Sequence, residues 1–130
     1  MSLLDRICEH EGFEPKPYPD PLSGGEPYTF GHGLTFITEE ESKEIVRGRI
    51  VKLQSEIMDG FPWVTSQPVI EVMIEMAYQM GVRGLSNFTN FLAACKRGDY
   101  QTAADEMLDS RWAVQTPSRA RELADIVRAQ

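Results

Sequence analysis

The sequence has little cysteine, no long hydrophobic run and no excess of positive charge, and each absence excludes a class of protein. Its two cysteines, Cys8 and Cys95, are too few for a disulfide scaffold and lack the spacing of metal ligands. No apolar run approaches the roughly 20 residues that a membrane-spanning helix requires. The formal net charge of −7 disfavours nucleic acid as a partner. We therefore expect a soluble protein with two buried free thiols and no stable membrane association.

The N-terminal segment also lacks the features of an export signal. Its residues, MSLLDRICEHEG, carry acidic side chains early and contain no long apolar segment. On this basis we predict a protein without a signal peptide that stays in the cytoplasm where it is made. Sequence repeats, low-complexity segments and flexible linkers are absent too, so we expect a single domain over residues 1–130.

The periodicity of the apolar residues predicts an α+β protein that is mostly helical, with a small hairpin near its front. Prolines and glycines exclude a helix from residues 13–27 and favour the hairpin there. We expect a small lobe over about 12–38 and a helical lobe over about 60–130. A long helix over 39–58 would join the two lobes, and a short helix over 1–11 would pack on the C-terminal lobe.

The residues that could carry chemistry lie close together in the first part of the chain. Glu11 follows Ile7 by four residues, which places it at the edge of an apolar helical stripe and at the end of that helix. A half-buried carboxyl suits a general acid, although the position also fits a surface residue at a frayed helix end. Asp20 falls in the Pro- and Gly-rich loop, and Thr29 falls in a short strand. Two carboxylates and a hydroxyl in this arrangement predict a site that cleaves sugars.

His32 stands between Gly31 and Gly33 in what we expect to be a tight turn. No second histidine, cysteine or carboxylate stands at ligand spacing from it. A packed or exposed turn histidine is therefore the favoured interpretation. We predict no metal and no cofactor for this protein.

Several short segments, in the same order along the chain, resemble the phage-type (T-even-like) lysozymes of glycoside hydrolase family 24. In the first half these segments are EG (11–12), YPD (18–20) and YTFGHG (28–33). In the second half they are AYQMG (77–81), NFTN (87–90) and SRWAVQTPSRA (110–120). The resemblance covers nearly the whole chain and implies a lysozyme-like fold.

The resemblance implies a muramidase, which cuts the β-1,4 bond between N-acetylmuramic acid and N-acetylglucosamine in peptidoglycan. By this resemblance Glu11 is the general acid, Asp20 the second carboxylate, and Thr29 the hydroxyl that helps to place the attacking water. Arg119 matches a basic residue that pairs with the catalytic glutamate across the cleft. The positions that resemble the family's substrate-binding residues are Leu34, Tyr78, Phe91 and Glu106.

The resemblance leaves several roles open. A phage or prophage endolysin is the leading hypothesis: a monomer held in the host cytoplasm before its release to the cell wall, with peptidoglycan glycan strands as its partner. A lysozyme carried on a virion, a wall-binding module without activity, and a lytic transglycosylase are the alternatives. A separation of about 6.5–9.5 Å between the two carboxyl groups favours inversion, which is the outcome that we predict, with Asp20 as the base.

Overall fold

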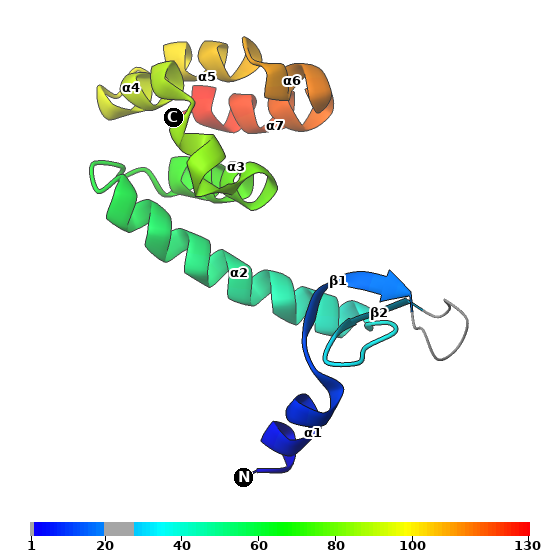
Figure 1. Ribbon diagram of the computed structural model, residues 1–130. Coiled ribbons are helices and arrows are strands. Elements are labelled where there is room, and N and C mark those ends of the chain that lie inside the picture. Colours follow the sequence, from blue (N-terminus) through cyan, green and yellow to red (C-terminus); the bar gives the residue numbers. More distant parts are fainter. Residues whose placement is uncertain (1, 20–27) are drawn as a thin grey trace. The chain divides into compact units, whose positions relative to one another are not determined.

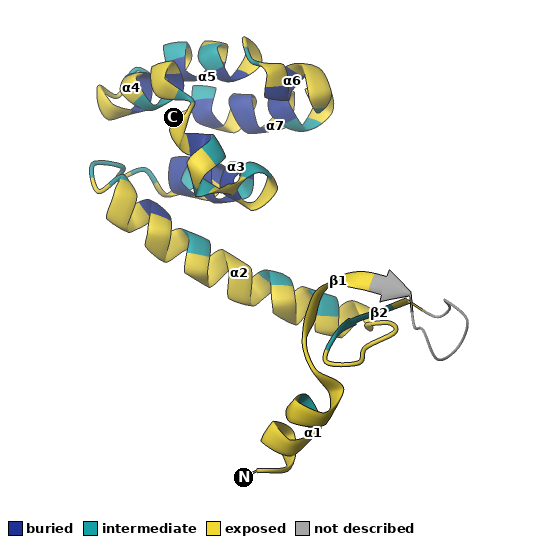
Figure 2. Ribbon diagram, viewed as in Figure 1, coloured by how far each residue is buried: buried dark blue, intermediate teal, exposed yellow. Residues whose placement is uncertain are grey.

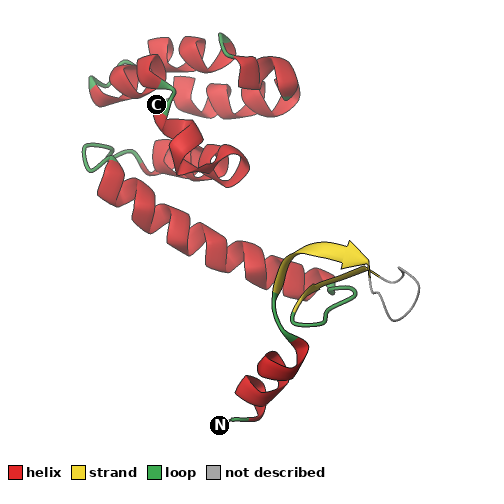
Figure 3. Ribbon diagram, in the orientation of Figure 1, coloured by secondary structure: helices red, strands yellow, loops and turns green. Residues whose placement is uncertain are grey.

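The structure is a computed structural model that describes residues 2–19 and 28–130. The chain forms two compact units, Met1–Ile45 and Val46–Gln130. The described part is mostly helical, with one two-stranded antiparallel sheet (Figures 1 and 3), and this confirms the predicted α+β class.

The N-terminal unit begins with helix α1, Leu3–Glu11. Ser2 caps it: the Ser2 hydroxyl accepts a hydrogen bond from the Asp5 amide at 3.0 Å, and the Asp5 carboxylate accepts in return from the Ser2 amide and hydroxyl. The helix ends at Gly12, whose φ of 72° is left-handed and whose amide donates to the Cys8 carbonyl at 3.0 Å. These local signals confirm the short helix that the sequence predicts.

A hairpin follows, formed by strands β1, Glu14–Pro19, and β2, Tyr28–Gly31. Glu14 lies opposite Gly31 and Tyr18 lies opposite Thr29, so β1 uses more residues than β2 between these two pairs. This irregularity is a bulge, and β1 contains alternate prolines, which lack the amide that a regular ladder requires. The predicted hairpin is confirmed, and residues 20–27 between its strands lie outside the described residues.

Helix α2, Glu39–Gly60, is the predicted long helix and ends slightly later than expected. Its start carries a complete capping box, because the Glu41 amide donates to the Thr38 hydroxyl at 3.1 Å and the Thr38 amide donates to the Glu41 carboxylate at 2.9 Å. This contact lowers the pKa of the Glu41 carboxyl, since the hydrogen bonds from Thr38 favour the charged form.

The C-terminal unit contains the remaining helices. In chain order they are α3 (Gln67–Ser86), α4 (Thr89–Lys96), α5 (Tyr100–Leu108), α6 (Arg111–Gln115) and α7 (Pro117–Arg128). The N-terminal end of α3 is capped by the Ser66 hydroxyl, that of α5 by the Asp99 carboxylate and that of α6 by the Ser110 hydroxyl. Helix α3 is kinked at Gly81, whose φ of 79° and ψ of 159° are not helical.

The hydrophobic core lies in the C-terminal unit (Figure 2). Val69, Met73 and Met76, which recur along α3 at helical spacing, are fully buried. Cys95 is buried and free, as predicted. Cys8 is free but only half-buried, and it lies on α1, a helix without any buried residue. Burial raises the pKa of the Cys95 thiol to about 12, so this group stays protonated.

Candidate functional site

Glu11 is the last residue of α1 and is exposed. The apolar stripe beside it, formed by Leu3, Leu4 and Ile7, is exposed as well. The half-buried setting that the sequence suggests for Glu11 is therefore not found in the N-terminal unit. What fixes the carboxyl in this unit is a different contact, with a turn that comes later in the chain.

That turn, Phe30 to Leu34, lies directly against the Glu11 side chain. Its ends are closed by two reciprocal hydrogen bonds: the Phe30 amide donates to the Leu34 carbonyl at 2.8 Å, and the Leu34 amide donates to the Phe30 carbonyl at 2.9 Å. Between them, Gly31 and Gly33 take left-handed φ values of 57° and 72°. A Cβ atom built on Gly33 would lie 2.9 Å from Cδ of Glu11, so the carboxyl rests on the bare face of this glycine.

Thr29 occupies the middle of β2, two residues before the first glycine of this turn. The side-chain oxygen of Thr29 is buried and has no hydrogen-bond partner in the part of the chain that the structure describes. Buried hydroxyls are normally paired with protein or ordered water, so this one calls for an explanation. A hydroxyl in this state is available to bind a water molecule.

The other predicted residues of the N-terminal unit have different outcomes. Asp20 follows the last residue of β1 and lies outside the described residues. Leu34 is 43% exposed and closes the glycine turn through its backbone. His32 contacts Phe13, with their ring centroids 5.3 Å apart. This contact agrees with the packed or exposed turn histidine that the sequence favours.

Arg119 begins the second group of predicted residues, on the C-terminal unit. Its Nε donates to Oε2 of Glu75 at 2.8 Å, and both side chains are about half-exposed. Arg119, Glu75 and Tyr78 line one cavity of about 440 Å³, whose walls also include apolar residues of α2 and α3 such as Ile50 and Ile74. Arg119 and Tyr78, which the resemblance gives different roles, thus line the same cavity.

Sequence reasoning missed Glu75 as a member of this cavity. The available signal was its charge: it interrupts the apolar run between Ile74 and Met76, one helical turn before Tyr78. A charged residue in such a run needs a partner, and the partner turned out to be Arg119, which is distant in sequence.

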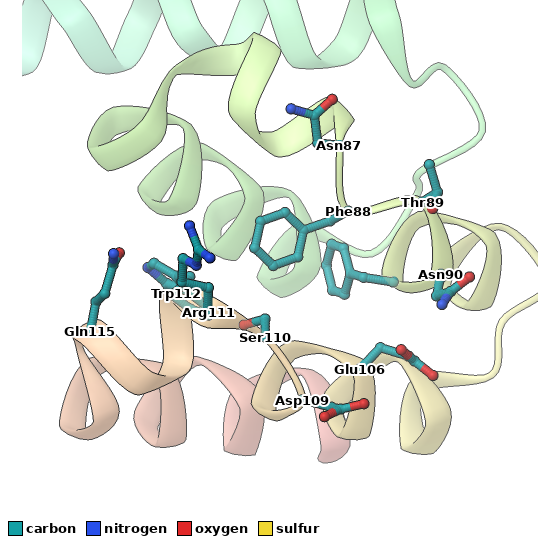
Figure 4. Close-up of a pocket in the computed structure, with 11 residues that line it drawn as sticks. Asn87, Phe88, Thr89, Asn90, Glu106, Asp109, Ser110, Arg111, Trp112 and Gln115 are labelled. Atoms are coloured by element: carbon teal, nitrogen blue, oxygen red, sulfur yellow. The ribbon is translucent and has the colours of Figure 1, made fainter.

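Phe91 and Glu106 line a second cavity of the C-terminal unit, of about 360 Å³ (Figure 4). Phe91 is only 1% exposed, so it forms part of the aromatic floor, with Phe88 edge-on to both Phe91 and Trp112. Glu106 is half-buried at the rim. The family resemblance groups these two residues with Leu34 and Tyr78 as substrate-binding positions, and Tyr78 lines the other cavity.

Polar residues that the sequence did not single out complete this second cavity. Figure 4 shows Asp109 beside Glu106 at one end, and Gln115 at the other end near Trp112. The two carboxylates have no ion-pair partner among the described residues. The indole nitrogen of Trp112 is occupied, because it donates to the Gln79 side chain on α3 at 2.9 Å.

Over the ranges 2–19 and 28–130, no group of three or more histidine, cysteine and acidic residues is placed to hold a metal ion. Within the same ranges, no helix has both the length and the hydropathy needed to cross a membrane.

Comparison with known proteins agrees with the resemblance. The family model described as phage lysozyme matches residues 8–128. The pre-baseplate central spike protein Gp5 of Enterobacteria phage T4 is 31% identical over 96 residues, which cover 70% of this chain. The match covers only 17% of the length of that spike protein. Because the family model matches nearly all of the sequence, the chain belongs to the phage lysozyme family, a family of glycoside hydrolases.

Proposed function

We propose that this protein is a muramidase that hydrolyses the β-1,4 bond between N-acetylmuramic acid and N-acetylglucosamine in peptidoglycan. The observation that carries the proposal is the constellation in the N-terminal unit. A glutamate carboxyl rests on a glycine turn, and the strand that leads into this turn holds a threonine hydroxyl without a partner among the described residues. Membership of a glycoside hydrolase family supports the same reaction.

In the proposed mechanism Glu11 protonates the glycosidic oxygen as the bond breaks. Asp20 accepts a proton from the attacking water, and Thr29 holds that water through its hydroxyl. The water attacks the anomeric carbon from the face opposite the leaving oxygen, so one displacement inverts the configuration. The unpartnered state of Oγ1 supports the role of Thr29, because a water bound there would satisfy a buried polar atom.

We further propose, as the family resemblance implies, that Arg119 is the basic partner of Glu11. Its hydrogen bond to Glu75 uses Nε, and a guanidinium carries further N–H donors on its two terminal nitrogens. Glu75 can therefore hold the arginine in place while those donors bind a second carboxylate. Glu75→Gln would test this arrangement by loosening Arg119 without removing its charge.

We propose Leu34, Tyr78 and Glu106 as substrate contacts, and Phe91, which the resemblance groups with them, as a residue that supports the binding surface from beneath. Tyr78 is 40% exposed in the cavity with Arg119, which leaves its ring and hydroxyl accessible to a sugar. Phe91 is too buried for stacking, so its contribution is to form the floor under Glu106. Peptidoglycan is the substrate class that the family implies.

The biological setting has two candidates. The sequence favours an endolysin held in the host cytoplasm until release. The relative in phage T4 favours the alternative, a lysozyme carried on the virion, because it is named as a central spike protein. Mass spectrometry of purified phage particles separates them: the virion role predicts this chain in the particle, and the endolysin role predicts that it is absent from the particle.

A clearing assay on purified peptidoglycan tests the activity. We expect wild type to clear the suspension and Glu11→Gln to be slower by about 1000-fold, because general acid catalysis contributes roughly 100- to 10,000-fold. Glu9→Gln is the matched control, since it removes the same charge from an exposed position on α1. Asp20→Asn should also lose most activity.

Three results of the same assay would count against parts of the proposal. If wild type leaves peptidoglycan intact, the chain is a binding module and not an enzyme. If Glu11→Gln clears as fast as Glu9→Gln, Glu11 is not the acid. If Asp20→Asn keeps full activity and the products carry anhydro-muramyl ends, the enzyme is a lytic transglycosylase.

A further inference from the structure

The contact between Glu11 and Gly33 joins the end of α1 to the glycine turn after β2. A Cβ atom built on Gly33 would lie 2.9 Å from Cδ and 3.3 Å from Cγ of Glu11, and closer still to Oε2. The first of these distances is shorter than the separations that real Cβ atoms show. The carboxyl position seen in the structure is therefore compatible with glycine at position 33 and with no larger residue.

The turn that presents Gly33 is held by its own backbone. The reciprocal hydrogen bonds between Phe30 and Leu34 fix both ends of the turn, and the left-handed φ of 72° at Gly33 sets the direction of its Cα face. Glu11, in contrast, presents the far end of a flexible side chain to this face. If a Cβ atom were added at position 33, the Glu11 side chain would therefore move and the turn would stay in place.

We propose that Gly33 is a positioning residue for the general acid. Because Gly33 has no side chain, the Glu11 carboxyl can pack against its Cα, and this contact holds the carboxyl where it can protonate the glycosidic oxygen. The catalytic part of this inference rests on the proposed function, in which Glu11 is the acid. The placement of the carboxyl is independent of it. A catalytic group held about 1 Å from its productive position can lose about 100-fold in rate, so a methyl group at position 33 should impair catalysis.

Gly33→Ala tests the proposal against two matched variants. Gly98→Ala has a similar left-handed φ of 75° and lies in the C-terminal unit, with no atom within 4 Å of the built Cβ. Gly31→Ala lies in the same turn, and its Cβ would meet only the end of the Leu34 side chain, at 3.3 Å. All three variants carry the backbone strain of a left-handed alanine, and only Gly33→Ala collides with Glu11.

We expect Gly33→Ala to lower kcat by about 10- to 100-fold with KM within about twofold of wild type. Its melting temperature should fall about as far as that of Gly31→Ala, because the collision is relieved by a side chain. Gly98→Ala should keep the wild-type kcat. If kcat of Gly33→Ala stays within about twofold of Gly98→Ala, the proposal is wrong.

Carboxyl NMR decides the placement without any activity. With ¹³C-labelled glutamate, the Cδ resonance of Glu11 should move in Gly33→Ala and stay unchanged in Gly31→Ala and Gly98→Ala. In wild type, a nuclear Overhauser effect should join the Hγ protons of Glu11 to the Hα protons of Gly33. Absence of this effect would overturn the inference even if Gly33→Ala failed to fold. An inactive wild type that shows both signals would refute the proposed function and leave the placement standing.

Discussion

The two units of this protein are stabilised in different ways. In the C-terminal unit, helices α3 to α7 bury a continuous set of apolar side chains, and Val69, Met73 and Met107 are fully inaccessible. In the N-terminal unit, no described residue is buried (Figure 2). Its described elements are held by capping boxes, a strand ladder and a glycine turn.

This difference separates the unit that stabilises the fold from the unit in which we propose that the reaction takes place. A fully buried side chain of the size of methionine contributes about 1.5–3 kcal/mol to folding, so the C-terminal unit supplies the free energy of folding. The N-terminal unit carries Glu11 and Thr29 on a helix end and a short strand, where few apolar contacts constrain them. Segments of this kind have low local stability and commonly carry function.

The largest expected effect contrasts the two units directly. Met73→Ala, in the core, should lower the free energy of unfolding by about 2–5 kcal/mol, because it leaves a cavity in α3 packing. Phe36→Ala, at a residue that is 73% exposed in the N-terminal unit, should change it by less than about 0.5 kcal/mol. Urea unfolding measures both values. Equal losses would show that the N-terminal unit has a core of its own.

Thr29→Val should lower activity without lowering stability. Valine keeps the shape of threonine but removes a buried hydroxyl that has no partner among the described residues. The free energy of unfolding should stay the same or rise by about 1 kcal/mol, while kcat falls by about 10- to 100-fold. Thermal unfolding and turnover on peptidoglycan give the two numbers. A clear loss of stability would mean that the hydroxyl has a structural partner in the folded protein.

The buried thiol of Cys95, in the C-terminal unit, should make the free energy of unfolding depend on pH. Its pKa is raised by burial to about 12, whereas an unfolded thiol ionises near pH 8.5, so above that pH the unfolded state binds fewer protons. The contribution of this thiol is complete below about pH 8.5 and falls by roughly 1.4 kcal/mol per pH unit as the pH rises toward 12. Unfolding free energies at pH 8 and 10 measure this slope.

Cys95→Ala is the control for that slope. The variant should be less stable at pH 8 because it loses buried volume, and its stability should decline less between pH 8 and pH 10 than that of wild type. Parallel declines in the two proteins would show that other groups, and not this thiol, set the alkaline limit.

The smallest expected effect concerns the rim of the second cavity. Glu106→Gln keeps the size of the side chain and removes a half-buried charge, so we expect KM for peptidoglycan to change by less than about fivefold, with kcat unchanged. Glu122→Gln, an exposed residue of α7 outside both cavities, is the matched control. A drop in kcat for Glu106→Gln would place this carboxylate nearer to the reacting bond than we propose.

Local features of the fold could be predicted from the sequence because their causes are local. The capping boxes at Ser2 and Thr38 involve residues three positions apart, so a short stretch of sequence contains both partners of each. The apolar stripe of α3 follows helical periodicity, so the buried face of this helix can be predicted from its sequence. The bulge in β1 was not predicted, because strand register depends on the pairing partner.

The contacts that define the candidate site could not be predicted from local pattern. Glu11 meets Gly33, and Arg119 meets Glu75, across long stretches of chain that sequence periodicity does not relate. The exposure of Glu11 agrees with one of the two positions that the sequence allows, because an apolar stripe indicates a face to be covered but does not say what covers it. The family resemblance supplied the roles of the residues, and the geometry of the turn supplied the contact that fixes Glu11.

The central claim is that Glu11 and a water held by Thr29 cleave the glycan in one displacement. The most direct test is proton NMR of the first products from purified peptidoglycan, before mutarotation. The mechanism predicts a new reducing end on N-acetylmuramic acid in the α-configuration, because inversion converts the β-bond. A first product in the β-configuration would contradict the single displacement, and an anhydro end would contradict hydrolysis.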